Sequence, residues 1–429
     1  MSSRRAESPA PRLERAALVS LITRATRHVD SDLALDELEG LARSAGADVV
    51  LRAVQERPTP DPATLIGRGK AEMLGAACAE AGANLIIVDN VLTPAQARNL
   101  EKTCGHRVID RTELILDIFA RRARTREGQL QVELAQLHYM LPRLAGSSDA
   151  LSRLGGGIGT RGPGETKLET DRRRIRYRIA ALKLQIAEVR RRRSYLRARR
   201  RRADVPTVAL VGYTNAGKTT LFNLLTGSGA VVSDALFVTL DPLMRRVKLP
   251  DARQILVADT VGFIDRLPHQ LVAAFHATLE EVAGADLLLH VIDASAPDRD
   301  RRSDAVRSVL MDVEAAAVPI VDVFNKIDLL SRTELAGLKA AHPDALWISA
   351  QHATGRDPLI ATIADRLAMD AERMRLEFDE TREADRRLVA ELYRHARVVS
   401  HVTEDARTSI EADVPRRLMD RFTRAKVPA

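Results

Sequence analysis

The chain has 429 residues and a formal net charge of +8, with 66 Lys and Arg against 58 Asp and Glu. A chain of this length is expected to hold two or three domains. Its two cysteines offer neither a disulfide framework nor zinc-ligand spacing, and no apolar run approaches the roughly 18 residues of a membrane span. These features exclude disulfide-rich secreted proteins and membrane channels, so we expect a cytoplasmic protein.

The N-terminal region predicts a small α/β domain. Residues 1–16 are charged and lack an apolar pattern, which predicts a disordered tail, and short apolar runs alternate with helical stretches from 17 to 111. This alternation is typical of a largely parallel sheet. The predicted strands are Leu18–Thr23, Asp48–Val54, Leu85–Val88 and Val108–Asp110, and the predicted helices are Leu33–Ala45, Lys70–Ala81 and Pro94–Thr103.

Residues 112–203 predict a helical hairpin. Two sets of apolar residues recur at alternating steps of three and four, which is typical of a coiled-coil seam. The sets are Leu130, Leu134, Leu137, Leu141 and Leu144, and Ile175, Ile179, Leu182, Ile186 and Val189. Pro142 should kink or end the first arm, and the glycine-rich loop 155–164 joins the two arms.

The second arm of this hairpin is strongly basic. Residues 172–202 contain fifteen Arg or Lys and one acidic residue, Glu188. A solvated face usually mixes both signs, whereas this pattern favours contact with a polyanion such as nucleic acid. A merely solvated face is the alternative. The candidate RNA contacts are Arg161 and Lys167 beside the glycine-rich loop, and Arg190, Arg191, Arg192 and Arg193 in the helix.

A phosphate-binding motif opens the next region, residues 204–372. It has the pattern G-x-x-x-x-G-K-[ST] and lies between an apolar run, 208–211, and a helical stretch. We expect its backbone N–H groups to surround the phosphates, Lys218 to neutralise the β- and γ-phosphates, and Thr219 to hold Mg²⁺. The candidate nucleotide-binding residues are Gly212, Tyr213, Thr214, Asn215, Ala216, Gly217, Lys218, Thr219 and Thr220.

A second motif follows an apolar strand and consists of Asp259, Thr260, Val261 and Gly262. We expect Asp259 to reach Mg²⁺ through a water and the Gly262 N–H to sense the γ-phosphate. Many GTPases place a water-orienting glutamine directly after this motif. Here the next residue is Phe263, which has no hydrogen-bonding side chain. Hydrolysis by the isolated protein should therefore be slow until a partner or another segment completes the site.

A third motif specifies guanine, and it consists of Asn325, Lys326, Ile327 and Asp328. Asp328 can accept two hydrogen bonds from guanine N1–H and the 2-amino group, which adenine does not offer. Asn325 should help to read the other purine edge, and the Lys326 stem should cover the base. Ser349 and Ala350 end a later strand, where a backbone N–H could contact guanine O6. The three motifs together predict a GTPase with GTP as substrate and Mg²⁺ as cofactor.

Residues 373–429 predict a small α+β domain, with strands at Met374–Phe378, Ala396–Val402 and Thr408–Ala412 around one helix. The predicted fold class is therefore α/β. A P-loop GTPase domain is preceded by a small α/β domain with a helical hairpin and followed by a small α+β domain.

The chain resembles the HflX family of GTPases over roughly residues 17–415. The resemblance is carried by 155–174, 212–218, 236–242 and 259–264. It implies that Phe237, Val238 and Thr239 belong to the nucleotide site and that Thr239 is the switch threonine that completes the Mg²⁺ shell. Lys218, Thr239 and Gly262 are the catalytic candidates.

The resemblance also implies a function on the ribosome. It implies a ribosome-stimulated GTPase that binds the large (50S) subunit and its rRNA through the N-terminal domain and hairpin, and dissociates stalled or idle 70S ribosomes under stress. Three alternatives stay open: a large-subunit assembly GTPase that leaves mature ribosomes intact, a nucleotide switch for a protein effector, and an ATP-driven RNA remodeller. We expect a monomer, free in the cytoplasm or partly associated with ribosomes or a membrane surface.

Overall fold

A computed structural model describes most of the chain, in two compact units. Unit 1 holds the described residues up to Ile186 together with Ala235–Phe237, and unit 2 holds the others. The described residues are 14–24, 31–144, 163–202, 205–232, 235–237, 241–250, 253–265, 281–313, 315–368, 371–404, 406–415, 418–422 and 425. Most of the glycine-rich loop, with Arg161, and the switch residues Val238 and Thr239 lie outside them. The domain boundaries expected from the sequence stay a prediction.

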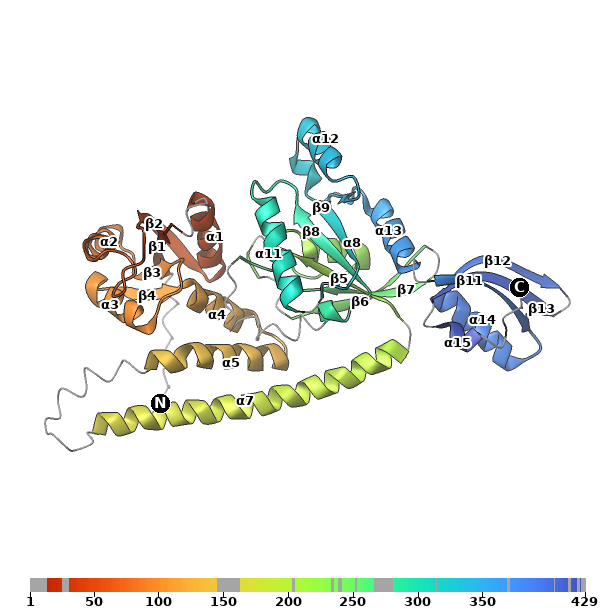
Figure 1. Ribbon diagram of the computed structural model, residues 1–429, viewed down its shortest axis with the longest axis horizontal. Coiled ribbons are helices and arrows are strands. Elements are labelled where there is room, and N and C mark those ends of the chain that lie inside the picture. The colour runs from red at the N-terminus through yellow and green to blue at the C-terminus, as the bar shows by residue number, and fades with distance from the viewer. Residues whose placement is uncertain are drawn as a thin grey trace, which may run out of the picture. The chain divides into compact units, whose positions relative to one another are not determined.

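Unit 1 contains a four-stranded, all-parallel sheet in the order β2-β1-β3-β4 (Figure 1). Helices flank both faces of the sheet in Figure 1, with α1 on the opposite side from α2 and α3. The elements are β1 (Glu14–Ile22), α1 (Ser31–Ser44), β2 (Ala47–Glu56), α2 (Arg68–Ala81), β3 (Leu85–Val88), α3 (Pro94–Cys104), β4 (Arg107–Asp110) and α4 (Arg111–Arg122). The predicted alternation of strands and helices, and the parallel sheet, are confirmed.

Local sequence explains these elements. β3 is buried along its whole length, as expected for a strand covered on both faces. α3 begins with a capping box between Thr93 and Gln96. The predicted tail of residues 1–16 extends too far, because β1 already begins at Glu14. The Arg15 N–H donates to Asn84 Oδ1 at 2.9 Å, and the apolar residues that follow are buried.

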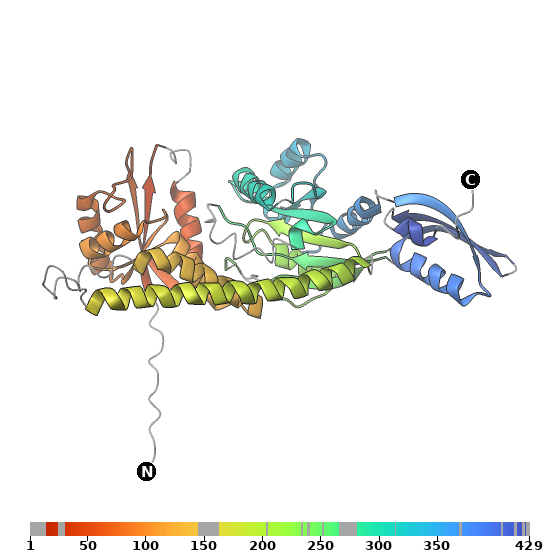
Figure 2. The ribbon, with the colours of Figure 1, turned by 60° about the horizontal axis from the view of Figure 1, so that its bottom comes forward.

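The helical hairpin is confirmed, and its two helices contact each other within unit 1, whereas the part of α7 from Ala187 onward belongs to unit 2. α5 (Arg126–Arg143) ends one residue after Pro142, and α7 (Pro163–Arg202) is one continuous helix (Figure 2). The two helices run antiparallel, because Arg178 pairs with Glu133 at 2.6 Å while Arg126 donates to Gln185 at 3.3 Å. The predicted seam of α7 is buried at its centre, at Ile179, Leu182 and Ile186.

Unit 2 contains a six-stranded sheet in the order β10-β9-β8-β5-β7-β6, in which only β6 runs antiparallel to its neighbour. β5 lies between β7 and β8, so the carboxyl ends of these parallel strands meet at one edge, where open α/β sheets bind ligands. The strands are β5 (Thr207–Gly212), β6 (Leu243–Lys248), β7 (Gln254–Asp259), β8 (Leu287–Asp293), β9 (Ile320–Asn325) and β10 (Leu346–Trp347). The helices are α8 (Lys218–Thr226), α11 (Arg299–Asp312), η2 (Ile327–Leu329), α12 (Arg332–Ala341) and α13 (Arg356–Ala368).

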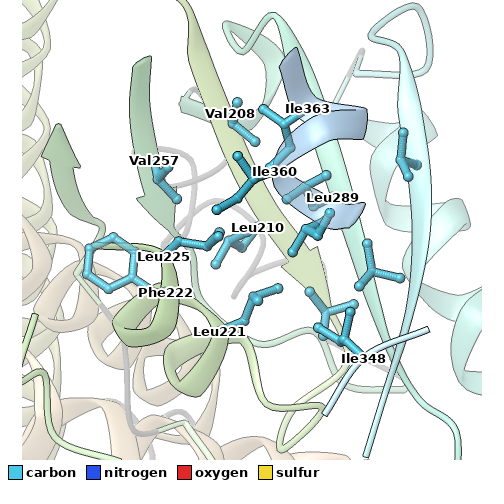
Figure 3. Close-up of a cluster of buried hydrophobic side chains, with 14 of the residues drawn as sticks. Val208, Leu210, Leu221, Phe222, Leu225, Val257, Leu289, Ile348, Ile360 and Ile363 are labelled. Atoms are coloured by element: carbon cyan, nitrogen blue, oxygen red, sulfur yellow. The ribbon is translucent and has the colours of Figure 1, made fainter. Parts of the chain in front are cut away.

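A hydrophobic core supports this edge of the sheet. Figure 3 shows side chains from β5, β7 and β8 packed with side chains from α8 and α13. They include Val208, Leu210, Val257, Leu289, Leu221, Phe222, Leu225, Ile360 and Ile363, all of them buried. The core fixes the strand ends that carry the three sequence motifs.

The C-terminal part of unit 2 is a three-stranded antiparallel sheet in the order β11-β13-β12. It comprises β11 (Ala371–Asp379), α14 (Glu383–His395), β12 (Arg397–Glu404), β13 (Arg407–Pro415) and α15 (Met419–Phe422). α14 covers one face of this sheet (Figure 2), over buried Met374, Leu376 and Ile410. The predicted α+β region is confirmed. In the described part of the chain, no helix combines the length and apolar composition needed to cross a bilayer.

Candidate nucleotide-binding site

The phosphate-binding loop connects β5 to α8. Its backbone has positive φ at Asn215 (59°) and at Gly217 (93°), which a glycine adopts without strain. A Cβ atom on Gly217 would lie 2.2 Å from Asn325 Nδ2, and one on Gly212 would lie 2.3 Å from the Val291 carbonyl oxygen. Both glycines are therefore required by close packing.

Lys218 opens α8 and lies inside the loop. Its Nζ donates to the carbonyl oxygens of Gly212 at 3.0 Å and Tyr213 at 2.7 Å, and the residue is 6 % exposed. Burial lowers the pKa of Lys218 to about 8, against the opposing effect of the Asp259 carboxylate. Phosphate charges beside Nζ would favour the protonated form. The lysine is thus placed to neutralise a bound phosphate.

The expected Mg²⁺ ligands of the first two motifs lie together. The Thr219 hydroxyl donates to Asp259 Oδ2 at 2.8 Å, and Asp259 is fully buried at the end of β7. Hydroxyl and carboxylate oxygens are the ligands that Mg²⁺ prefers, usually with phosphate oxygens and waters. The two side chains therefore fit a magnesium ion bound together with a nucleotide. Within the described residues, the buried Thr214 hydroxyl of the same loop has no hydrogen-bond partner.

Gly262 lies beside the phosphate-binding loop. A Cβ atom on Gly262 would be 2.8 Å from Thr214 Cα and 3.1 Å from Lys218 Nζ. Within the same motif, the Thr260 hydroxyl donates to the Leu210 carbonyl at 2.6 Å and fixes the strand end. Gly262 is therefore close enough to the lysine for both to serve one phosphate group.

Asn325 joins two loops at the side of the site where the guanine base is expected. It is 3 % exposed, its Nδ2 donates to the Ala216 carbonyl at 2.9 Å, and its Oδ1 accepts from the Ala350 N–H at 2.9 Å. The side chain thus holds the phosphate loop to the loop of Ser349 and Ala350. Its expected reading of the purine edge, and an Ala350 contact with guanine O6, stay predictions.

Lys326 and Asp328 occupy the turn after β9. Lys326 has a positive φ of 63°, and its Nζ donates to Asp293 Oδ2 at 2.7 Å. The Asp328 side chain is 23 % exposed and lies 3.9 Å from His352 Nε2. We did not predict roles for Asp293 or His352 from the sequence. For Asp293 the sequence did hold a signal of a role in the site, because this residue lies at the carboxyl end of an apolar strand, β8.

Phe237 is the one described residue of the implied switch segment 237–239. It packs in unit 1, where its ring meets the ring of Phe119 edge-on with centroids 4.8 Å apart. The nucleotide-site role implied for it stays a prediction.

The basic surface of α7 is exposed where it is described. Arg191 and Arg192 are 80 % and 76 % exposed, and both pair with the same acid, Glu188. Arg174 is 78 % exposed. One carboxylate cannot neutralise two guanidinium groups, so the helix keeps an excess of accessible positive charge. The side chains of Lys167 and Arg193 lie outside the described residues.

Three family profiles match consecutive parts of the chain. They are "GTP-binding GTPase N-terminal" over residues 32–120, "GTP-binding GTPase Middle Region" over 122–200 and "50S ribosome-binding GTPase" over 207–326.

The chain is also similar to curated proteins named GTPase HflX. The protein of Caldanaerobacter subterraneus is 46 % identical over 95 % of this chain and 93 % of its own. The Escherichia coli protein is 48 % identical over 78 % of this chain and 79 % of its own, and that of Magnetococcus marinus is 50 % identical over 77 % and 76 %.

Proposed function

This chain belongs to the HflX family of GTPases and hydrolyses GTP, and from that premise we propose that it binds the large ribosomal subunit and dissociates 70S ribosomes under stress. The observation that carries the proposal is the exposed basic surface of α7, on which Arg191 and Arg192 share one carboxylate. Ribosomal RNA supplies phosphates for such a surface, and binding would release counterions. The protein would act in the cytoplasm, where ribosomes are found.

The chemistry of the nucleotide site follows from its described side chains. Lys218 neutralises the β- and γ-phosphates, and the buried loop keeps the phosphates in a fixed orientation. Thr219 and Asp259 would hold Mg²⁺, which would supply positive charge at the phosphate oxygens. Asp328 selects guanine, because an adenine base would leave its carboxylate unpaired.

Hydrolysis needs help from the ribosome in this proposal. Phe263 follows the second motif, is 2 % exposed and has no polar side-chain group with which to orient water. Missing catalytic groups supplied by a partner raise the rates of small GTPases by roughly 10³–10⁵-fold. We expect a smaller gain on addition of 50S subunits.

Dissociation of purified 70S particles tests the proposal. With a non-hydrolysable GTP analogue, sedimentation should show free 50S and 30S subunits after addition of the protein. Lys218→Ala should abolish the effect, whereas Lys339→Ala should not, because Lys339 is exposed on α12. Binding to 50S without dissociation of 70S would contradict the proposal and favour a large-subunit assembly factor.

A further inference from the structure

The chain segment that follows the second motif is held against the phosphate-binding loop by its main chain. The Phe263 N–H donates to the Gly212 carbonyl at 3.1 Å, and the Phe263 carbonyl accepts from the Thr214 N–H at 2.7 Å. These bonds form a parallel bridge between Tyr213 and Phe263 beyond the end of the paired strands. The position of Gly262, the expected γ-phosphate sensor, is therefore set relative to the phosphate-binding loop.

The Tyr213 side chain adds a second point of attachment. Its phenol oxygen accepts a hydrogen bond from the Asp265 N–H at 2.8 Å. Tyr213 is 5 % exposed, and the Arg302 guanidinium lies 5.1 Å from the centre of its ring. A buried ring with a bonded hydroxyl has little freedom to move. Tyr213 thus connects the phosphate loop directly to the residue two positions after Phe263.

Arg301, on α11, supplies the third point of attachment. Its guanidinium donates to Asp265 Oδ2 at 2.8 Å and to Asp298 Oδ2 at 2.6 Å. Asp298 also lies 2.7 Å from Arg302 Nε, and its side chain is 7 % exposed. Burial acts to raise the pKa of Asp298, but hydrogen bonds and charge from the two arginines lower it overall. Asp298 is therefore ionised at neutral pH and anchors Arg301.

From this geometry we propose that Tyr213 and Arg301 are positioning residues for GTP hydrolysis, which hold the segment Gly262–Asp265 in its place beside the phosphates. Gly262 has no side chain, the Phe263 side chain is buried and the Asp265 carboxylate is held by Arg301, so backbone groups of Gly262 and Phe263 would face the γ-phosphate and the attacking water. Their position then decides the rate, because a displacement of about 1 Å can cost 10²-fold in catalysis. The inference rests on GTP hydrolysis alone and not on the proposed ribosomal function.

Two variants test the proposal with the full-length protein in the absence of ribosomes. Tyr213→Phe removes the hydroxyl acceptor and keeps the ring, and Arg301→Gln removes the charge that holds Asp265. Each should lower the single-turnover hydrolysis rate and the affinity for a non-hydrolysable GTP analogue by about 3- to 10-fold, the usual effect of removing one hydrogen bond. GDP affinity should stay within about twofold of wild type, because GDP has no γ-phosphate for Gly262 to contact.

Matched controls make the same chemical changes elsewhere. Tyr393→Phe removes a hydroxyl that contacts His401 in the C-terminal sheet, and Arg307→Gln removes a charge on α11 that pairs with Asp322 at 2.7 Å. Both should leave hydrolysis and nucleotide affinity unchanged. In the double variant Tyr213→Phe/Arg301→Gln the losses should be less than additive, since both residues act on Asp265.

Two results would overturn the proposal. The first is a wild-type rate and a wild-type ratio of GTP-analogue to GDP affinity in both single variants. The second is an equal loss of affinity for GDP and for the GTP analogue, together with a matching loss of folded protein in thermal melts. Tyr213 and Arg301 would then be purely structural residues.

Discussion

The nucleotide site and the basic helix α7 are built in opposite ways. Lys218, Asp259 and Asn325 are 6 %, 0 % and 3 % exposed, and each makes at least one hydrogen bond to a fixed partner. Arg191 and Arg192 are 80 % and 76 % exposed and share one acid. A buried polar group is costly to disturb, whereas an exposed ion pair contributes little. Single substitutions in the nucleotide site should therefore weaken nucleotide binding. On α7, only several substitutions made together should weaken 50S binding.

The largest effect is expected from the core below the nucleotide site. Phe222 is fully buried on α8, and Phe222→Ala should lower the free energy of unfolding by about 3–5 kcal/mol. Tyr177→Ala on α7 removes an equally bulky ring that is 71 % exposed, and it should change stability by less than about 0.5 kcal/mol. Urea unfolding can be followed by the fluorescence of Trp347, the only tryptophan of the chain. An equal loss of unfolding free energy in the two variants would contradict the expected difference between buried and exposed residues.

The next largest effect concerns base recognition. Asp328→Asn should weaken GTP binding by roughly 2–4 kcal/mol, because it breaks a charged, two-bond contact with guanine. The same variant should favour xanthosine triphosphate, whose base carries a 2-oxo group. Asp344→Asn, at an exposed position just before β10, is the control. Unchanged GTP affinity in Asp328→Asn, measured by nucleotide titration, would exclude Asp328 as the guanine-reading residue.

Two glycines with positive φ, Gly217 and Gly227, allow the effect of backbone strain to be measured apart from the effect of a steric clash. Gly217→Ala should weaken binding of both GDP and GTP by roughly 1–3 kcal/mol, since its Cβ would meet Asn325 Nδ2 at 2.2 Å. Gly227 also has a positive φ of 65°, yet nothing lies within 4 Å of its Cβ position. Gly227→Ala should therefore cost stability of about 1–2 kcal/mol without a change in nucleotide affinity. If the two variants bind nucleotide with similar affinity, the close approach of Asn325 to Gly217 is not important for nucleotide binding.

The smallest effect per residue is expected on α7. If about five arginines engage phosphates, the log–log dependence of 50S binding on salt should have a slope of about −3.5 to −4.5. Replacement of Arg190, Arg191, Arg192 and Arg193 by glutamine should reduce that slope by about 0.7–0.9 for each phosphate that the variant no longer neutralises. Removal of the same charge from the C-terminal domain, at Arg382, Arg386, Arg387 and Arg394, should leave the slope unchanged. An unchanged slope in the α7 variant would identify its arginines as a solvated face.

The features that were predicted best from the sequence are those set by residues close together in the chain. The phosphate loop between β5 and α8, the alternation of unit 1 and the seam of α7 all follow from short-range patterns, and the structure confirms them. Contacts between distant elements were not predictable in this way. The pairing of Lys326 with Asp293 and of Arg301 with Asp265 depends on how separate strands and helices pack. Asn325 shows the same limit, since its motif predicts base recognition and not its buried link between two loops.

The most direct test of the account is the GTP hydrolysis rate with and without 50S subunits, for the wild type and the α7 variant. The wild-type rate should rise at least about tenfold with 50S, below the roughly 10³–10⁵-fold gain of small GTPases with their activators. The variant should keep the intrinsic rate and need a higher 50S concentration for the same stimulation. A fast intrinsic rate with no ribosomal effect, or equal stimulation of both proteins at every salt concentration, would contradict the account.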